Sequence, residues 1–182
     1  MSKKDAKRAE IAEKLASHVI GAGMADTGLR RLAEVAGTSD RMLLYYFDDK
    51  EDLIATVLTR IGAGLGETLS VQFGSAPKPP AEVLRFTWSL VKSDAVADQL
   101  RLWLDLSSLA GRGDAFYAGI VDAIAEGWIE MISALLDVPK EKQRPLAILM
   151  MAAVDGQVVL FPGDPSKGDA AIEALSRLLE AA

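Results

Sequence analysis

Apolar residues recur every three or four positions along most of the chain, which is the spacing of one face of an α-helix. The first such stripe contains Ile11, Leu15 and Val19 and predicts a helix from about Ala6 to Ile20. The alternating apolar and polar runs that mark half-buried strands are missing. The pattern therefore predicts an all-α fold.

Polar caps and glycines mark the expected helix boundaries in the first third of the chain. Thr27 is expected to cap a second helix, because its side-chain oxygen can accept a free backbone N–H, and Gly37 is expected to end that helix. Thr38 or Ser39 is then expected to cap a third short helix. Asp48, with a glutamate three residues later, resembles the capping box of a fourth helix.

The rest of the chain continues as helices after a proline-rich break. The run Pro77-Lys-Pro-Pro80 interrupts the pattern, and Asp114 and Asp169 are placed as N-caps of later helices. These later helices are expected near residues 81–93, 95–110, 114–137, 141–161 and 169–181.

Composition narrows the chemistry. The chain has 182 residues, 50% of them hydrophobic, and 20 Lys and Arg against 26 Asp and Glu give a formal charge of −6. The sequence has no cysteine, which excludes disulfides, thiol nucleophiles and zinc fingers. His18 is the only histidine, so a histidine-rich metal site is excluded as well, and we interpret it as a surface or packing residue. We expect no catalytic set, no metal and no cofactor.

The most apolar run does not predict a membrane span. It extends from Leu146 to Phe161, is interrupted by Asp155, and is shorter than the roughly 20 residues that a span needs. The charged N-terminus lacks the apolar stretch of a secretion signal. These patterns predict a cytoplasmic protein without membrane contact.

Residues 29–48 have the pattern of a helix-turn-helix, with two short helices joined by Gly37-Thr-Ser39. Ala33 is small where the two helices would meet, and the second helix would present its first residues to a DNA major groove. Arg41 can pair with guanine, while tyrosines near the end of the helix can reach phosphates or thymine methyl groups. The residues predicted to contact DNA from this helix are Ser39, Asp40, Arg41, Met42, Tyr45 and Tyr46.

The same segment resembles the DNA-binding domain of TetR-family transcriptional regulators. The resemblance rests on the Leu-Ala-x-x-Ala-Gly turn, the closing Tyr-Phe and the Lys-Glu-x-Leu that opens the next helix, and it covers about 45 residues. It implies a homodimeric repressor that binds a palindromic DNA operator and releases it when a small molecule binds. By position, the resemblance assigns Thr27, Tyr46 and Lys50 to phosphate contacts. Leu44 departs from the family, which usually has tyrosine there, and this removes one expected contact.

Lys50 also has an argument of its own. A lysine in the first turn of a helix faces the positive end of the helix dipole, and a phosphate there would relieve the conflict. Other residues of the segment keep two interpretations. Tyr45, Tyr46 and Phe47 can be core aromatics instead of DNA contacts, and Arg30 and Arg31 can form a solvated face.

The resemblance implies that helices of the larger C-terminal part surround a ligand cavity. Three tryptophans fall on successive expected helices, and aromatic and methionine side chains suit an apolar pocket. Two aspartates lie within apolar runs, where an unpaired carboxylate is costly to bury. The predicted ligand contacts are Trp88, Trp103, Asp105, Trp128, Met131 and Asp155. The tryptophans can instead be core residues, which is the commoner role of tryptophan in a helical bundle. Asp105 can be a surface residue, and Asp155 can form a contact between helices or subunits.

Together these patterns predict a DNA-binding domain at residues 1–50 and a domain for ligand binding and dimerisation at 51–182. The last two helices carry small residues and an apolar stripe of Ile172, Leu175, Leu178 and Leu179, and they are expected to pair with a second copy. The expected partners are double-stranded DNA, the second subunit and a small, largely apolar effector. The alternative is an all-helical small-molecule-binding protein or enzyme that does not bind DNA.

The distribution of charge fits the DNA-binding interpretation. Residues 1–47 carry 8 positive and 6 negative groups, a balance of +2, so the remaining residues carry −8. A module with so small an excess has little general attraction for DNA and depends on a few placed contacts. The net charge therefore favours a selective DNA binder.

Overall fold

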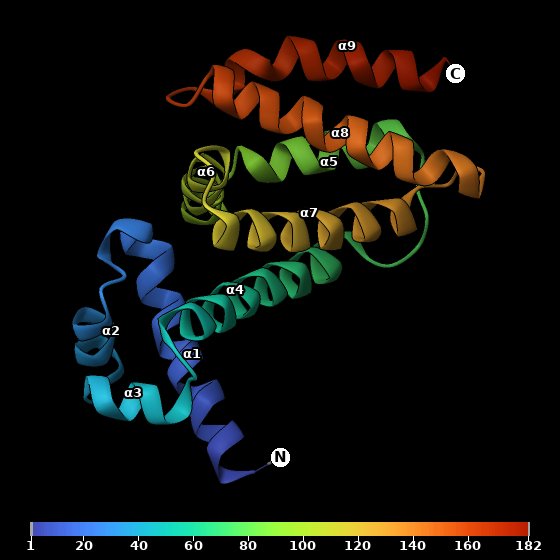
Figure 1. Cartoon of the computed structure of the whole chain (residues 1–182). Coiled ribbons are helices and arrows are strands. Elements are labelled where there is room, and N and C mark those ends of the chain that lie inside the picture. The colour runs from blue at the N-terminus through green and yellow to red at the C-terminus, as the bar shows by residue number, and fades with distance from the viewer. Residues whose placement is uncertain (1, 182) are drawn as a thin grey trace. The chain divides into compact units, whose positions relative to one another are not determined.

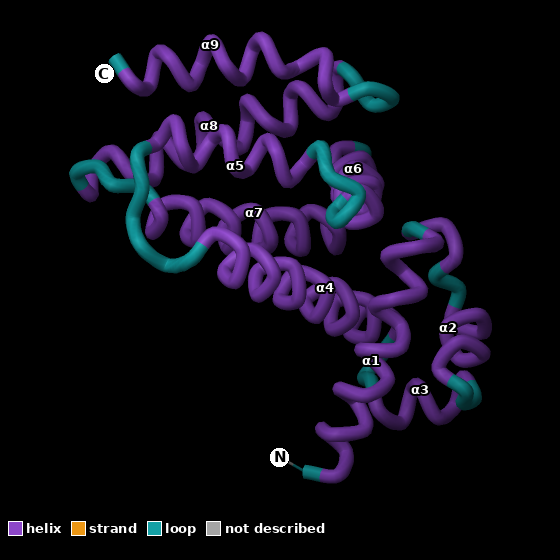
Figure 2. The backbone as a smooth tube through the Cα atoms, turned by 180° about the vertical axis from the view of Figure 1, so that it is seen from behind, coloured by secondary structure: helices purple, strands orange, loops and turns teal. Residues whose placement is uncertain are grey.

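The computed structural model describes residues 2–181, apart from the side chains of residues 65, 67–70 and 72 (Figure 1). Figure 2 shows helices and loops only over this part of the chain, which confirms the predicted all-α fold. The α-helices are α1 Lys3–Ala22, α2 Leu29–Ala36, α3 Asp40–Tyr46, α4 Lys50–Phe73, α5 Pro80–Val91, α6 Ala97–Gly111, α7 Ala115–Leu135, α8 Lys140–Leu160 and α9 Asp169–Glu180, and the short 3-10 helices are η1 Met24–Asp26 and η2 Pro165–Gly168.

The chain folds into two compact units that differ from the predicted division at residue 50. The first unit contains Met1–Val71 and Asp98–Ile124, and the second contains Gln72–Ala97 and Ala125–Ala182. Helix α4 therefore belongs mainly to the same unit as the helix-turn-helix, and α7 runs from the first unit into the second. The functional boundary at residue 50 stays a prediction.

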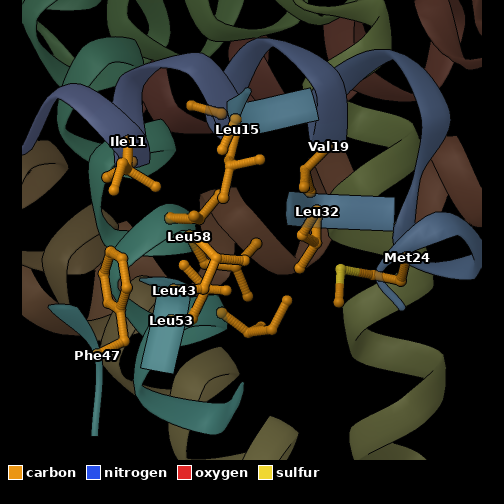
Figure 3. Close-up of a cluster of buried hydrophobic side chains, with 14 of the residues drawn as sticks. Ile11, Leu15, Val19, Met24, Leu32, Leu43, Phe47, Leu53 and Leu58 are labelled. Atoms are coloured by element: carbon orange, nitrogen blue, oxygen red, sulfur yellow. The ribbon is translucent and has the colours of Figure 1, made fainter. Parts of the chain in front are cut away.

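The core of the first unit holds α1 to α4 together (Figure 3). The predicted α1 stripe is buried, and Leu15 meets Leu43 of α3 and Leu58 of α4 in this cluster. Burying one such side chain contributes about 1.5–3 kcal/mol, so the cluster fixes the position of the two short helices that could not be stable alone. Its largest fully buried members are Ile11, Leu15, Leu32, Leu43, Phe47, Leu53, Ile54, Leu58 and, from α6, Leu106.

Helix α1 begins three residues earlier than the sequence pattern predicts. Ser2 and Asp5 form a capping box, in which the Ser2 hydroxyl accepts the Asp5 backbone N–H at 3.1 Å and the Asp5 carboxylate accepts the Ser2 backbone N–H at 2.9 Å. These hydrogen bonds hold the pKa of Asp5 below its usual value. The apolar stripe starts only at Ile11, so periodicity alone does not reveal this first turn.

The start of α4 is capped by Asp49, so the expected cap at Asp48 is wrong by one residue. The Asp49 carboxylate accepts the backbone N–H of Asp52 at 2.8 Å. The backbone N–H of Asp48 instead donates to the Asp52 carboxylate at 3.0 Å. Asp52 thus accepts the N–H of the residue before the cap, so these two hydrogen bonds do not form the reciprocal capping box that the sequence predicted.

In the second unit, α5 packs against both α8 and α9. Trp88 of α5 is 4% exposed, and its indole Nε1–H donates to the Asp169 carboxylate at 2.7 Å. Gly168 lies against the Trp88 ring, where a Cβ atom would approach the indole to 2.9 Å. The N-cap of α9 is Gly168, so Asp169 is the first residue of the helix and not its cap.

The predicted N-cap at Asp114 is confirmed, because its carboxylate accepts the backbone N–H groups of Phe116 and Tyr117.

Candidate nucleic-acid interface

The turn between α2 and α3 has the geometry that the sequence predicts. Gly37 has φ 70° and ψ 39°, a left-handed conformation that glycine adopts without strain. The backbone N–H of Thr38 donates to the Ala33 carbonyl oxygen at 2.9 Å, which closes the end of α2. Ser39 then caps α3 by accepting the backbone N–H of Met42 at 3.3 Å. These hydrogen bonds set the angle between the two short helices.

Helix α3 has one buried side and one exposed side. Leu43 is fully buried in the core of the first unit, and Phe47, which follows the helix, is 1% exposed. Phe47 is therefore a core aromatic and not a DNA contact, which is one of the two interpretations that the sequence allowed. The opposite side of α3 presents Arg41, Leu44 and Tyr45 to solvent. Because Leu43 anchors the helix from within, the outward residues are held in fixed positions.

The exposed cations near this surface differ in how they are engaged. Arg30 and Arg31 lie within 3.6 Å of the Glu34 carboxylate, and Arg31 also donates to Asp26 at 3.1 Å. Within the described part of the chain, the side chains of Arg41 and Lys50 take part in no hydrogen bond or ion pair. Of these four cations, Arg41 and Lys50 have a charge that is available to an incoming anion, whereas Arg30 and Arg31 are partly neutralised.

The two predicted tyrosines have different surroundings. Tyr45 is 61% exposed, and the Lys4 ammonium lies 5.5 Å from the centre of its ring. Tyr46 is half-buried against the core, its ring meets that of Tyr45 edge-on at 5.1 Å, and its carbonyl oxygen accepts a hydrogen bond from Arg8. Tyr45 is therefore the more accessible of the two. Of the two tyrosines, Tyr46 is the one that packs partly against the core.

Thr27 does not cap α2 with its side chain, which corrects the sequence prediction. The N-cap of α2 is Gly28, and the Thr27 hydroxyl donates to the Met24 carbonyl oxygen at 2.9 Å. Thr27 is only 5% exposed. Its hydroxyl is already engaged within η1, so any phosphate contact at this position needs the backbone.

Arg8 joins the three helices that surround the candidate interface. Its guanidinium donates to both oxygens of Asp52 on α4 at 2.7 and 2.9 Å, and to the carbonyl oxygen of Tyr46 at the end of α3. It also donates to the Thr56 hydroxyl at 3.0 Å and lies over the Phe47 ring. Arg8 holds the pKa of the Asp52 carboxyl below its usual value, and Asp52 raises the pKa of Arg8. The pattern of apolar residues gave no sign of this polar contact.

His18 lies in a small polar cluster beside α2. Its Nε2 atom is 3.2 Å from the Asp26 carboxylate, which Arg31 also contacts. The ring is largely covered, with 14% of the side chain exposed. This agrees with a packing residue that joins α1 to η1.

The predicted ligand-contacting residues are divided between the two units. Trp103 and Asp105 lie on α6 in the first unit, whereas Trp88, Trp128, Met131 and Asp155 lie in the second. Trp88 is enclosed between α5 and the start of α9, which favours the core role weighed for it. Trp103, Trp128, Met131 and Asp155 are half-buried and stay predictions.

The expectation that Asp105 is buried among apolar residues is wrong. It is exposed, although it lies within an apolar run of α6. The burial cost that made it a candidate is absent, and the surface position weighed as its alternative is the one observed.

The second unit has a groove that the sequence pattern did not predict, with a volume of about 740 Å³. Phe73 and Phe86 form its aromatic part with ring centres 4.1 Å apart, and the Lys78 ammonium lies 5.3 Å from the Phe73 ring. Arg85 is engaged at one edge by Glu173 and Glu180. None of the predicted ligand residues lines this groove, whose lining is Phe73, Lys78, Pro79, Ala81, Glu82, Arg85, Phe86, Ser89 and Glu180.

Helices α8 and α9 expose a row of large apolar side chains. Val159 and Leu160 on α8 are 62% and 66% exposed, and Leu178 on α9 is 69% exposed. Ile148 and Leu149 continue the row on α8. Ile172 does not belong to it, because it is buried within its own unit. The exposed apolar surface that could pair with a second copy therefore lies mainly on α8, whereas the sequence also predicted a stripe on α9.

Two further observations bear on the class of protein. No helix in the part of the chain that the structure describes is both long and apolar enough to cross a bilayer. Among the same residues, no three acidic or histidine side chains are grouped so that they could hold a metal ion.

Similarity in structure extends over the whole chain. The fold resembles a TetR-family transcriptional regulator from Cytophaga hutchinsonii, with a TM-score of 0.77 and 17% identity, covering 100% of this chain and 96% of that one. A TetR-family regulator from Rhodococcus sp. gives a TM-score of 0.71 and 16% identity over 95% of this chain and 97% of that one. FadR from Bacillus subtilis, crystallised with stearoyl-CoA, gives a TM-score of 0.63 and 15% identity. The similarity covers 94% of this chain and 96% of that one. At this identity the likeness establishes the fold.

A match to a family model covers the segment that contains the candidate interface. Residues 12–57 match the family model of the bacterial regulatory proteins of the tetR family. No curated protein matches the chain. The matched segment contains α2, α3, the Gly37 turn and the start of α4, which are the elements that form the exposed surface described above. Residues 12–57 therefore match the tetR-family domain, and the whole chain shares the fold of the TetR-family regulators compared above.

Proposed function

We propose that the protein is a ligand-responsive repressor that binds a two-fold symmetric DNA operator as a homodimer. The observation that carries the proposal is the outward face of α3, where Arg41 has an exposed guanidinium with no described partner on a helix anchored by buried Leu43. A fixed helix with a free planar cation suits direct reading of guanine in the major groove.

Phosphate contacts would position α3 on the duplex. Lys50 begins α4 shortly after α3 ends, and Lys4 lies over the ring of Tyr45 in the last turn of α3. Ser39, Asp40, Met42 and Tyr46 complete the proposed interface. Such contacts fix the register of the protein on DNA, while base contacts supply the specificity.

Dimerisation is proposed through the exposed apolar residues of α8, with Leu178 of α9. Side chains such as Val159 and Leu160 are removed from water when a second copy covers them, which favours association. A two-fold interface presents two copies of α3, and this matches a palindromic operator with half-sites roughly 34–36 Å apart.

The proposed effector is a small, largely apolar molecule. The half-buried Trp128 and Met131 of the second unit supply the apolar surface, and Asp155 of the same unit supplies a polar group. FadR, which shares the fold, was crystallised with the acyl thioester stearoyl-CoA. Effector binding would shift the population toward a form whose two α3 helices no longer fit successive major grooves. The proposed protein acts in the cytoplasm and catalyses no reaction.

A selection from a random DNA pool tests the proposal. The wild-type protein is expected to enrich a two-fold symmetric sequence, and the enriched duplex then serves in a screen for effectors that release it. Arg41→Ala is expected to relax the preference at one base pair in each half-site, a loss of about 1–3 kcal/mol in discrimination. Identical sites from wild type and variant would remove Arg41 from base reading, and no enrichment would reject DNA binding.

A further inference from the structure

Leu44 is a large aliphatic residue on the outward side of α3. It is 48% exposed, in contrast to its neighbour Leu43, which is completely buried. Leu44 therefore contributes little to the core that holds α3. Scattered exposed leucines are ordinary on protein surfaces. The significance of this one lies in what shares its face of the helix.

Arg41 and Leu44 are three residues apart, so they lie side by side on the same face of α3. The side chain of Arg41 has no hydrogen bond or ion pair within the described residues, so its planar donors are free. Leu44 has neither a donor nor an acceptor and can contribute only apolar contact. This face of α3 therefore combines the hydrogen-bond donors of the Arg41 guanidinium with the aliphatic side chain of Leu44.

The two side chains match two features of base edges in the major groove. Guanine presents the N7 and O6 acceptors that an arginine fork pairs with, and thymine presents a C5-methyl group. We infer that Leu44 packs on the methyl group of a thymine close to the guanine that Arg41 reads. The inference rests on the proposed function, because it names what this same surface recognises.

The spacing of the two residues limits where the thymine lies. Three residues of helix advance by about 4.5 Å. Successive base pairs are about 3.4 Å apart. The thymine therefore lies within two base pairs of the guanine in each half-site. Tyr45, whose ring is covered by Lys4 at 5.5 Å, is assigned to the backbone beside these bases.

Removal of single methyl groups from the DNA tests this inference. Each thymine of the selected duplex is replaced in turn by deoxyuridine, which has the same hydrogen-bonding groups and lacks the methyl group. Binding is measured by fluorescence anisotropy at one salt concentration. Wild-type protein is expected to lose about four-fold in affinity at one thymine per half-site, and about 15-fold when both half-sites are changed. A 5-methylcytosine at that position is expected to restore part of the loss relative to cytosine.

Variants of Leu44 assign the effect to this side chain. Leu44→Ala and Leu44→Gln are expected to bind thymine and deoxyuridine equally at that position, whereas Leu44→Met retains the discrimination. Val71→Ala, which shortens an exposed aliphatic side chain on α4, is the matched control and keeps the wild-type profile. Because Leu44 is exposed, its variants are expected to melt at the wild-type temperature.

The outcomes separate this inference from the proposed function. If the protein selects a duplex but no deoxyuridine weakens binding, or if Leu44→Ala keeps the wild-type sensitivity, Leu44 does not read a methyl group and the regulator proposal stands. If the protein binds no DNA, both proposals fail together.

Discussion

The guanidinium of Arg8 on α1 and the carboxylate of Asp52 on α4 form a two-pronged ion pair, with Nη2–Oδ1 at 2.7 Å and Nη1–Oδ2 at 2.9 Å. Both side chains are less than a third exposed, at 29% and 28%. Arg8 also binds the last carbonyl group of α3. One side chain therefore connects the helix that presents Arg41 to the helix that begins with Lys50.

Loss of this ion pair is expected to destabilise the first unit. Arg8→Ala removes four hydrogen bonds and leaves Asp52 partly covered without its cation, which is expected to lower the free energy of unfolding by about 1–2 kcal/mol. Urea denaturation followed by circular dichroism measures the change. Lys7→Ala, which removes an exposed ion pair from the same helix, is the control and is expected to leave the midpoint unchanged. Equal effects of the two substitutions would contradict a special role for Arg8.

The same ion pair predicts a dependence of stability on pH. Because Arg8 lowers the pKa of Asp52 in the folded protein, the unfolded chain binds this proton more readily. The stabilisation is therefore complete above the unfolded pKa of about 3.9, and it is lost as the pH falls through the lower folded pKa. Urea midpoints between pH 7 and pH 3 are expected to fall less steeply for Asp52→Asn than for wild type. Parallel curves for the two proteins would show that Asp52 does not contribute.

Lys50 is expected to contact a phosphate and to read no base. Lys50→Ala should weaken binding to all DNA sequences by similar factors and reduce the slope of log affinity against log salt by about 0.9 for each phosphate that Lys50 neutralises. Affinities measured at several salt concentrations give this slope. Lys142→Ala, on exposed α8, is the control for a simple change in net charge. An unchanged slope for Lys50→Ala would remove Lys50 from the set of phosphate-binding residues.

Charge on the exposed face of α8 is expected to separate the proposed dimer. Val159→Arg places a cation where we propose that a second α8 packs, and an unpaired buried charge is strongly unfavourable. Sedimentation equilibrium is expected to give a dimer for wild type and a monomer for the variant. Val71→Arg, at a residue 85% exposed on α4, is expected to remain dimeric. A dimeric Val159→Arg protein would place the interface elsewhere.

Much of the interface could be predicted from the sequence because its requirements are local. The left-handed turn at Gly37 and the cap at Ser39 depend on neighbouring backbone atoms, and both are observed. The cap of α4 was misplaced for a related reason. Asp48 and Asp49 are adjacent residues with equal capping ability, and only the register of α4 against the core decides between them.

Features that depend on tertiary packing could not be predicted in this way. Asp105 lies in an apolar run, yet Leu102 and Leu106 point into the core while Asp105 is exposed, because successive helical residues face different directions. The groove lined by Phe73 and Phe86 joins residues from separate helices, and Arg8 contacts Asp52 across 44 positions of sequence. Such long-range pairs leave no periodic pattern in the chain.

The most direct test of sequence-specific DNA binding compares two duplexes of equal length. One contains the selected sequence, and the other contains the same bases in scrambled order; both are titrated with wild-type protein at physiological salt while the mass of the complex is measured. If α3 reads the bases, binding is expected to be at least about a thousand-fold tighter to the selected duplex, with two protomers on each duplex. Equal affinity for both duplexes would contradict a sequence-specific interface on α3.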